Sequence, residues 1–137
     1  MRASSLGSAA VVLLAFFLGG CSSNTISVVI ESSSETNARA PFYVVFRSVE
    51  QATYLTDTYD PIAAKVFANP PDPTVIRSEV IYPGFRLKLK VPKHDTTSLA
   101  IYFLFTNPGG RWKTSREQPL SSSVDIELEK NQIKSEG

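Results

Sequence analysis

The chain has 137 residues, 42% of them hydrophobic, and its 14 basic and 13 acidic side chains leave a formal net charge of +1. This balance argues against nucleic-acid binding, which depends on a strong basic excess that neutralises phosphates. The length suits one domain with its own core. A single cysteine excludes an internal disulfide, so burial of apolar side chains must supply the stability.

The first twenty residues have the layout of an export signal. Arg2 precedes an unbroken apolar run over residues 9–18, and Leu18-Gly19-Gly20-Cys21 follows at once. A hydrocarbon core takes roughly 20 apolar residues to cross, about twice the length of this run. We therefore expect the segment to be cleaved before Cys21 and not kept as a membrane span.

Leu18-Gly19-Gly20-Cys21 resembles the bacterial lipobox, in which a signal peptidase cuts before an acylated cysteine. The resemblance implies that Cys21 is a lipid anchor, because several acyl chains hold lastingly where one holds only marginally. An ordinary thiol beside an ordinary signal peptide is the alternative. Ser22 stands where an aspartate typically retains lipoproteins in the inner membrane, which implies the periplasmic face of the outer membrane. Cleavage leaves 117 residues, with 13 basic side chains once Arg2 is removed and 13 acidic ones.

Seven segments of the mature chain are predicted strands, because β-branched and aromatic residues cluster there in short runs bounded by turn formers. Two of them alternate apolar and charged residues, which predicts one buried and one solvent-exposed face. The basic row is Arg86, Lys88 and Lys90, and the acidic row is Asp125, Glu127 and Glu129. The rows could pair across neighbouring strands, or form a charged docking surface. The seven segments are Thr25–Glu31, Phe42–Val49, Thr74–Tyr82, Phe85–Val91, Ser98–Thr106, Arg111–Gln118 and Val124–Glu129.

One helix is predicted between the second and third strands, with Asp60 as N-cap and Pro61 at the first helical position. The proline-rich segment 69–73 ends it at about Ala68. Turn sequences at 93–97 and 107–110 predict hairpins, so the later part of the chain should form a meander. One helix is too few for a parallel sheet. We expect an all-β sandwich of about seven or eight strands with one short helical insertion.

The mature chain offers no predicted catalytic or metal site. Its one histidine, His94, lies in a predicted turn and has no Cys or His companion to share a metal. The acidic row is spaced along a strand and does not converge as calcium ligands do. Gly109-Gly110 follows a proline and does not open a helix, as a phosphate-binding loop would. We therefore expect neither an enzyme nor a cofactor nor a bound metal.

Four local patterns occur in a familiar order. Asn37 precedes Ala40-Pro41 and an apolar strand, residues 75–84 form a strand ending in Pro-Gly, Arg111-Trp112-Lys113 is followed by Pro119-Leu120, and Asp125–Leu128 is followed by Asn131. This order resembles the outer-membrane lipoprotein family of type VI secretion systems (TssJ, VasD-like). The resemblance covers about residues 25–131, and the polar stretch 50–67 departs from it. It suggests a signal peptide (1–20), an acylated tether (21–24), a sandwich domain (25–131) and a polar tail (132–137).

The resemblance implies a transthyretin-like β-sandwich and an architectural role. The family member lies under the outer membrane and binds the periplasmic C-terminal domain of the inner-membrane protein TssM. In that family the loop between the first two strands makes the contact. Glu35, Asn37 and Arg39 are its polar side chains able to specify a partner, and a merely solvated connection is the alternative. The corresponding residues are Ser32, Ser33, Ser34, Glu35, Thr36, Asn37, Ala38, Arg39, Ala40 and Pro41.

Two other functions remain open on the sequence. One is a different envelope interaction lipoprotein, such as a secretion pilotin or an assembly accessory, which would share only the lipobox and a sandwich. The other is a module that carries a small apolar ligand between its sheets, which a packed core would leave no room for.

Overall fold

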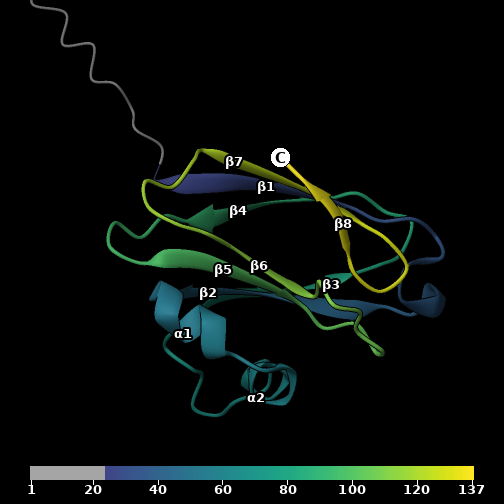
Figure 1. Ribbon diagram of the computed structural model, residues 1–137, viewed down its shortest axis with the longest axis horizontal. Helices are drawn as coiled ribbons and strands as arrows, with labels where there is room; N and C mark the ends of the chain where they lie inside the picture. Colours follow the sequence, from purple (N-terminus) through teal and green to yellow (C-terminus); the bar gives the residue numbers. More distant parts are fainter. Residues whose placement is uncertain (1–23) are drawn as a thin grey trace, which may run out of the picture.

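The computed structural model describes residues 24–137, which form two four-stranded sheets packed face to face (Figure 1). The predicted signal peptide and Cys21 lie outside the described residues. Within 24–137 no helix is long and apolar enough to span a membrane. The strands are β1 (Thr25–Glu31), β2 (Phe42–Val49), β3 (Val75–Ile81), β4 (Leu87–Pro92), β5 (Ser98–Phe103), β6 (Lys113–Arg116), β7 (Ser123–Leu128) and β8 (Ile133–Glu136), and the helices are η1 (Thr36–Arg39, a 3-10 turn), α1 (Gln51–Thr56) and α2 (Tyr59–Lys65).

The strand order is β4-β1-β7-β8 in one sheet and β3-β2-β5-β6 in the other. Side chains of period two from both sheets fill the space between them, among them Ile30 of β1, Phe46 of β2 and Ile126 of β7. The other face of β2 and β5 is buried as well, because Val45 and Tyr102 pack beneath Ile62 of α2. This confirms the predicted all-β sandwich, and it explains why β2 and β5 are apolar on both faces. The core is built wholly from residues 26–133.

The helical insertion differs from its prediction. The helix α2 begins earlier than expected, with Thr58 as N-cap, so Asp60 lies in its first turn and does not cap it. A second helix, α1, precedes it and was not predicted. None of its six residues is buried. The segment therefore lacks the row of apolar residues at helical spacing from which a helix is predicted.

The predicted meander is right at one of its two turns, since the strands β5 and β6 on either side of 107–110 pair antiparallel, and it is wrong at the other. The strands β4 and β5 belong to different sheets, so the turn at 93–97 is a corner between sheets and not a hairpin. The same turn formers serve both purposes, and for this reason the local sequence could not distinguish them. The strand β1 also pairs in parallel with β7, so the first sheet is mixed.

Residues 132–137, expected to be a polar tail, contain β8, which pairs antiparallel with β7. Ile133 is 1% exposed and joins the core. Only this residue of the strand is buried, so the segment offers a single apolar position and its alternation could not be read. The domain thus extends to the end of the described chain.

The predicted pairing between the two charged rows is also wrong, because β1 lies between β4 and β7. Val29 of β1 faces Lys88 on one side and Asp125 on the other. The basic and acidic rows therefore share the outer face of this sheet but are one strand apart.

Candidate functional site

The loop between β1 and β2 lies at one end of the sandwich, together with three other connections. The strands β1, β3, β5 and β7 all end there, which brings residues 32–41, 82–86, 104–112 and 129–132 to the same end (Figure 1). The described chain begins at the opposite end, where the backbone N–H of Lys93 donates to the carbonyl of Asn24 at 2.7 Å. The predicted contact loop is therefore separated from Asn24 by the length of β1.

The loop has an unusual backbone. Asn37, Ala38 and Arg39 have φ values of 52°, 50° and 68°, in the left-handed region. Such a conformation costs about 1–2 kcal/mol for a residue with a side chain, and it persists only where the surroundings hold it in place.

Asn37 supplies much of that support. Its side-chain amide donates to the carbonyl of Ala40 at 2.9 Å, and its Oδ1 accepts from the backbone N–H of Thr106 at 2.8 Å. Its own N–H donates to the carbonyl of Lys130 at 2.6 Å. The residue is 5% exposed, so it links three connections from inside. Asn37 is therefore a support of the loop and is not placed to touch a partner, contrary to the role predicted for it.

Two further contacts fix the first half of the loop. Thr36 is buried, and its Oγ1 accepts from the N–H of Ser33 at 3.1 Å. The hydroxyl of Ser32 accepts from the N–H of Gly84 at 3.2 Å, which joins the loop to the β3–β4 turn. Gly84 has a φ of 88°, a value that a side chain would disfavour.

The outward side of the loop carries the other two polar residues named by the sequence. Arg39 and Glu35 form an ion pair of 2.9 Å, with side chains 73% and 54% exposed. An exposed pair contributes about 0–1 kcal/mol, so either group can exchange its partner at little cost. Ser33, Ser34, Ala38, Ala40 and Pro41 are exposed beside them.

Two hollows border the loop. A groove of about 670 Å³ separates it from the β7–β8 turn and is lined by four glutamates, Glu31, Glu35, Glu127 and Glu129, and by two lysines. A second hollow of about 480 Å³ adjoins the first and shares Glu35, Lys130 and Asn131 with it, and it is also lined by Ala38, Ala40 and Asn107. The loop thus forms a ridge that borders both hollows, a shape that a partner protein can engage.

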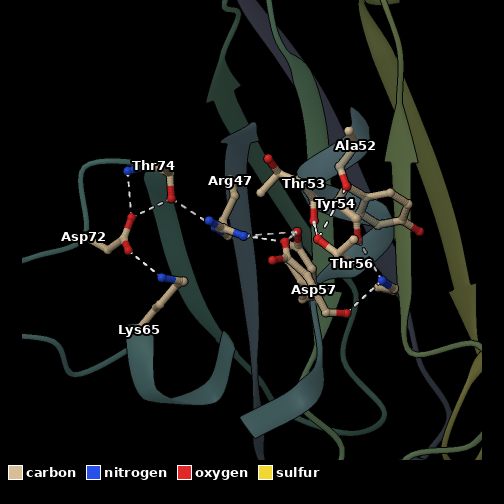
Figure 2. Close-up of polar contacts among 11 residues, drawn as sticks. Arg47, Ala52, Thr53, Tyr54, Thr56, Asp57, Lys65, Asp72 and Thr74 are labelled. Carbon is tan, nitrogen blue, oxygen red and sulfur yellow. Dashed lines mark hydrogen bonds and ion pairs between the residues drawn. The ribbon is translucent and has the colours of Figure 1, made fainter. Parts of the chain in front are cut away.

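A second polar cluster lies on the outer face of the β3-β2-β5-β6 sheet, beneath the helical insertion. Figure 2 shows Arg47 of β2 between Thr74 on one side and Asp57 on the other. The guanidinium forms an ion pair with Asp57, and its Nε donates to Thr74 Oγ1 at 3.0 Å. The hydroxyl of Tyr102 also donates to Asp57. Burial, and then this hydrogen bond to a carboxylate, raises the pKa of Tyr102.

Two lysines extend the cluster to the backbone and to the start of β3. Lys113 donates to the carbonyls of Tyr54 and Asp57 at 2.7 and 2.9 Å, and burial lowers its pKa. Lys65 of α2 contacts Asp72 at 2.6 Å. Hydrogen bonds from Lys65 and Thr74 hold the pKa of Asp72 well below its usual range.

This cluster fastens α1 and α2 to the sheet, and every buried side-chain N or O atom in the described chain has a hydrogen-bond partner. Sequence reasoning missed it, although the signal was present: Arg47 is the one charged residue in a strand that is apolar on both faces. A buried arginine at such a position needs a carboxylate. No group of three or more His, Cys, Asp or Glu side chains suited to a metal occurs in residues 24–137.

Comparison with known proteins places these features in context. The family model described as "IglE, N-terminal domain" matches residues 43–128. No curated protein matches the chain by sequence.

Solved structures share the fold. A chain of a structure described as "Type VI membrane complex" superposes with a TM-score of 0.63 at 14% identity, over 81% of this chain and 96% of that one. A chain of the structure of the "T6SS protein TssM C-terminal domain (869-1107) from EAEC" gives 0.63 at 14% identity, over 80% and 95%. The T6SS lipoprotein TssJ1 from Pseudomonas aeruginosa gives 0.60 at 14% identity, over 81% and 93%. At these identities the likeness establishes the fold, and it agrees with the resemblance found in the sequence.

Proposed function

The chain belongs to the family of the IglE N-terminal domain, and from this membership we propose that it is a lipoprotein of the periplasmic face of the outer membrane, a structural component of a type VI secretion membrane complex. Three observations support the proposal: the lipobox-like segment ending at Cys21, the family model over residues 43–128, and a fold shared with a type VI secretion lipoprotein. The role is architectural and needs no catalytic group.

Cys21 would carry the acyl chains that hold the protein in the membrane. Removing the thiol tests this directly, because Cys21→Ser leaves nothing to acylate. We expect the variant to stay uncleaved or to leave the membrane fraction, and we expect the wild-type chain to incorporate labelled palmitate. A wild-type chain without label would contradict the anchor.

The partner would be the periplasmic C-terminal domain of a TssM-like inner-membrane protein, bound through residues 32–41. The observation that carries this step is the loop itself, a ridge supported from within by Asn37 and placed at the end of the domain away from the tether. A rigid element at the end of the domain opposite Asn24 is suited to a partner that extends from the inner membrane. Preorganisation of this kind favours binding because little order has to be gained on contact.

Calorimetry of residues 22–137 with the TssM-like domain tests the partner and the site together. The informative variant is Glu35→Ala with Arg39→Ala, which removes exposed side chains and spares the buried support. Arg77→Ala with Glu79→Ala is the control, since it removes a half-exposed ion pair on β3, with side chains 38% and 35% exposed. We expect the loop variant to weaken binding at least about tenfold, or 1.4 kcal/mol, and the control to leave it unchanged. Equal binding by all three proteins would exclude Glu35 and Arg39 as contacts, and no binding by any of them would exclude the partner.

A further inference from the structure

The outer face of the β4-β1-β7-β8 sheet is divided by charge. On β4, Lys88 and Lys90 are exposed and lie two residues apart on the same face, about 7 Å along the strand. Their neighbour Arg86 is paired with Glu31 at 3.3 Å. Across β1, the acidic row of β7 begins with Asp125, which faces the other side of Val29.

Lys93 is half-buried at the end of β4 nearest the start of the described chain. It follows β4 directly, and its N–H donates to the carbonyl of Asn24 at 2.7 Å. We name Lys88, Lys90 and Lys93 the basic strip. Within residues 24–137 no ion pair joins any of these lysines to a carboxylate, so their charges are uncompensated.

The basic strip leads to the point where the chain enters the domain, because Thr25 pairs with Pro92 and Ser27 with Lys90. Covalent geometry bounds the distance from there to the anchor. Three peptide units separate Cys21 from Asn24, and an extended chain spans at most about 3.6 Å per residue, or about 11 Å. This is close to the distance of about 8–10 Å over which charges act at physiological ionic strength. An acylated Cys21 would therefore hold Lys93, at the near end of the strip, close to the lipid headgroups. Lys90 and Lys88 lie about 10 and 17 Å farther along β4, so they reach the headgroups when this face of the sheet lies along the membrane.

We propose that the basic strip docks on anionic phospholipid headgroups of the membrane that holds Cys21, while the acidic row of β7 turns the other half of the face away. The inference rests on the lipid anchor proposed above. Headgroup attraction on one side of β1 and repulsion on the other fix the rotation of the domain about its tether. The membrane thereby sets the direction in which residues 32–41 are presented.

The single cysteine of the chain makes the test direct. Residues 21–137, which contain the whole core, are coupled through Cys21 to a maleimide lipid in vesicles of phosphatidylcholine, with or without about one-third phosphatidylglycerol. Lysines are then acetylated briefly with acetic anhydride, an uncharged reagent, and quantified by mass spectrometry. We expect acetylation of Lys88 and Lys90 to fall at least about threefold on the anionic vesicles, and to recover in about 1 M salt, where screening shortens to about 3 Å.

Lys130 and Lys134 provide internal controls, since they are exposed at residues adjoining the acidic row. We expect their acetylation to be the same on both vesicles. The double variant Lys88→Gln with Lys90→Gln should abolish the protection of Lys93, whereas Lys130→Gln with Lys134→Gln should preserve it, with circular dichroism confirming that both fold.

Equal acetylation on the two vesicle types would overturn the proposal. So would equal protection of Lys130 and Lys134, or protection that appears only when a periplasmic protein is added. Coupling through the maleimide replaces natural acylation and needs no TssM-like partner. A failure here would therefore leave the partner and the biological anchor to be judged by their own experiments.

Discussion

The Asn37 support and the Arg47 cluster are two buried polar arrangements that hold surface segments in place by different means. Asn37 is a neutral amide that completes backbone hydrogen bonds of three connections. Arg47 is a charge whose burial depends on a single carboxylate, Asp57. A neutral amide left alone loses hydrogen bonds, whereas a charge left alone keeps its full desolvation cost. Loss of one partner should therefore cost more free energy of unfolding in the helical insertion than in the loop.

The largest effect should follow from breaking the charged arrangement. Asp57→Ala leaves Arg47 buried without a carboxylate, and removal of one partner of a buried pair costs about 3–5 kcal/mol. Urea unfolding followed by circular dichroism measures this change in the free energy of unfolding. Glu79→Ala, which breaks a half-exposed pair with Arg77, should cost about 1 kcal/mol at most.

Replacing both charged partners sharpens the same point. Arg47→Met with Asp57→Leu should recover most of the lost stability, because well-packed apolar residues commonly replace a buried ion pair at little cost. A double variant as unstable as Asp57→Ala would show that attraction between the two charges holds the insertion. The instability of Asp57→Ala would then not come from the desolvation of an unpaired arginine.

Breaking the neutral support should have the second-largest effect. Asn37→Ala leaves the N–H of Thr106 and the carbonyl of Ala40 without their partner, at about 1–2 kcal/mol for each group, the lower part of the range for an unsatisfied group, because Thr106 and Ala40 are exposed residues. We expect a total loss of about 2–4 kcal/mol in urea unfolding, together with weaker binding to the TssM-like domain although Asn37 is buried.

Two companion variants separate hydrogen bonding from backbone strain. Asn37→Asp keeps the acceptor for Thr106 and should lie between wild type and Asn37→Ala. Asn37→Gly relieves the positive φ of 52° but supplies no hydrogen bond. Full stability in the glycine variant would mean that strain, and not bonding, dominates this loop.

The sequence predicted the sandwich because β1 and β2 carry clear strand patterns with the bounds later observed. It did not predict the pairing of β1 with β7, since that contact joins residues about a hundred positions apart and no local pattern encodes it. At the loop, the sequence named Glu35, Asn37 and Arg39 together. A polar residue that serves a surface and one that serves a buried backbone look alike in sequence, and only the fold shows that Asn37 faces inward.

A fall in pH should loosen the contact between Asp72 and Lys65 at the edge of the Arg47 cluster. The pKa of Asp72 is lowered by its hydrogen bonds with Lys65 and Thr74, so the folded protein binds a proton there less readily than the unfolded chain. The resulting stability is present above the unfolded pKa of about 3.9 and is lost as the pH falls below it. Lys65→Met should cost about 1 kcal/mol at neutral pH and should flatten the loss of stability between about pH 4 and pH 2. Glu136, whose pKa is also lowered, contributes to the same range, so the variant must be compared with wild type at each pH. If the dependence of stability on pH were the same in the variant and in wild type, Lys65 would not be what lowers the pKa of Asp72.

The smallest effect on stability should come from the exposed side of the loop. Exchanging the two charges, Glu35→Arg with Arg39→Glu, keeps an ion pair at the same two positions while reversing its direction. Because the pair is exposed, we expect the free energy of unfolding to stay within about 0.5 kcal/mol of wild type. Binding to the TssM-like domain should nevertheless fall, since a partner that reads these charges meets each of them in the wrong place. Calorimetry and urea unfolding on the same preparation separate the two outcomes. Loss of both would mean that the loop's outer side also supports the fold, and retention of both would mean that the partner recognises the shape of the ridge and not its charges.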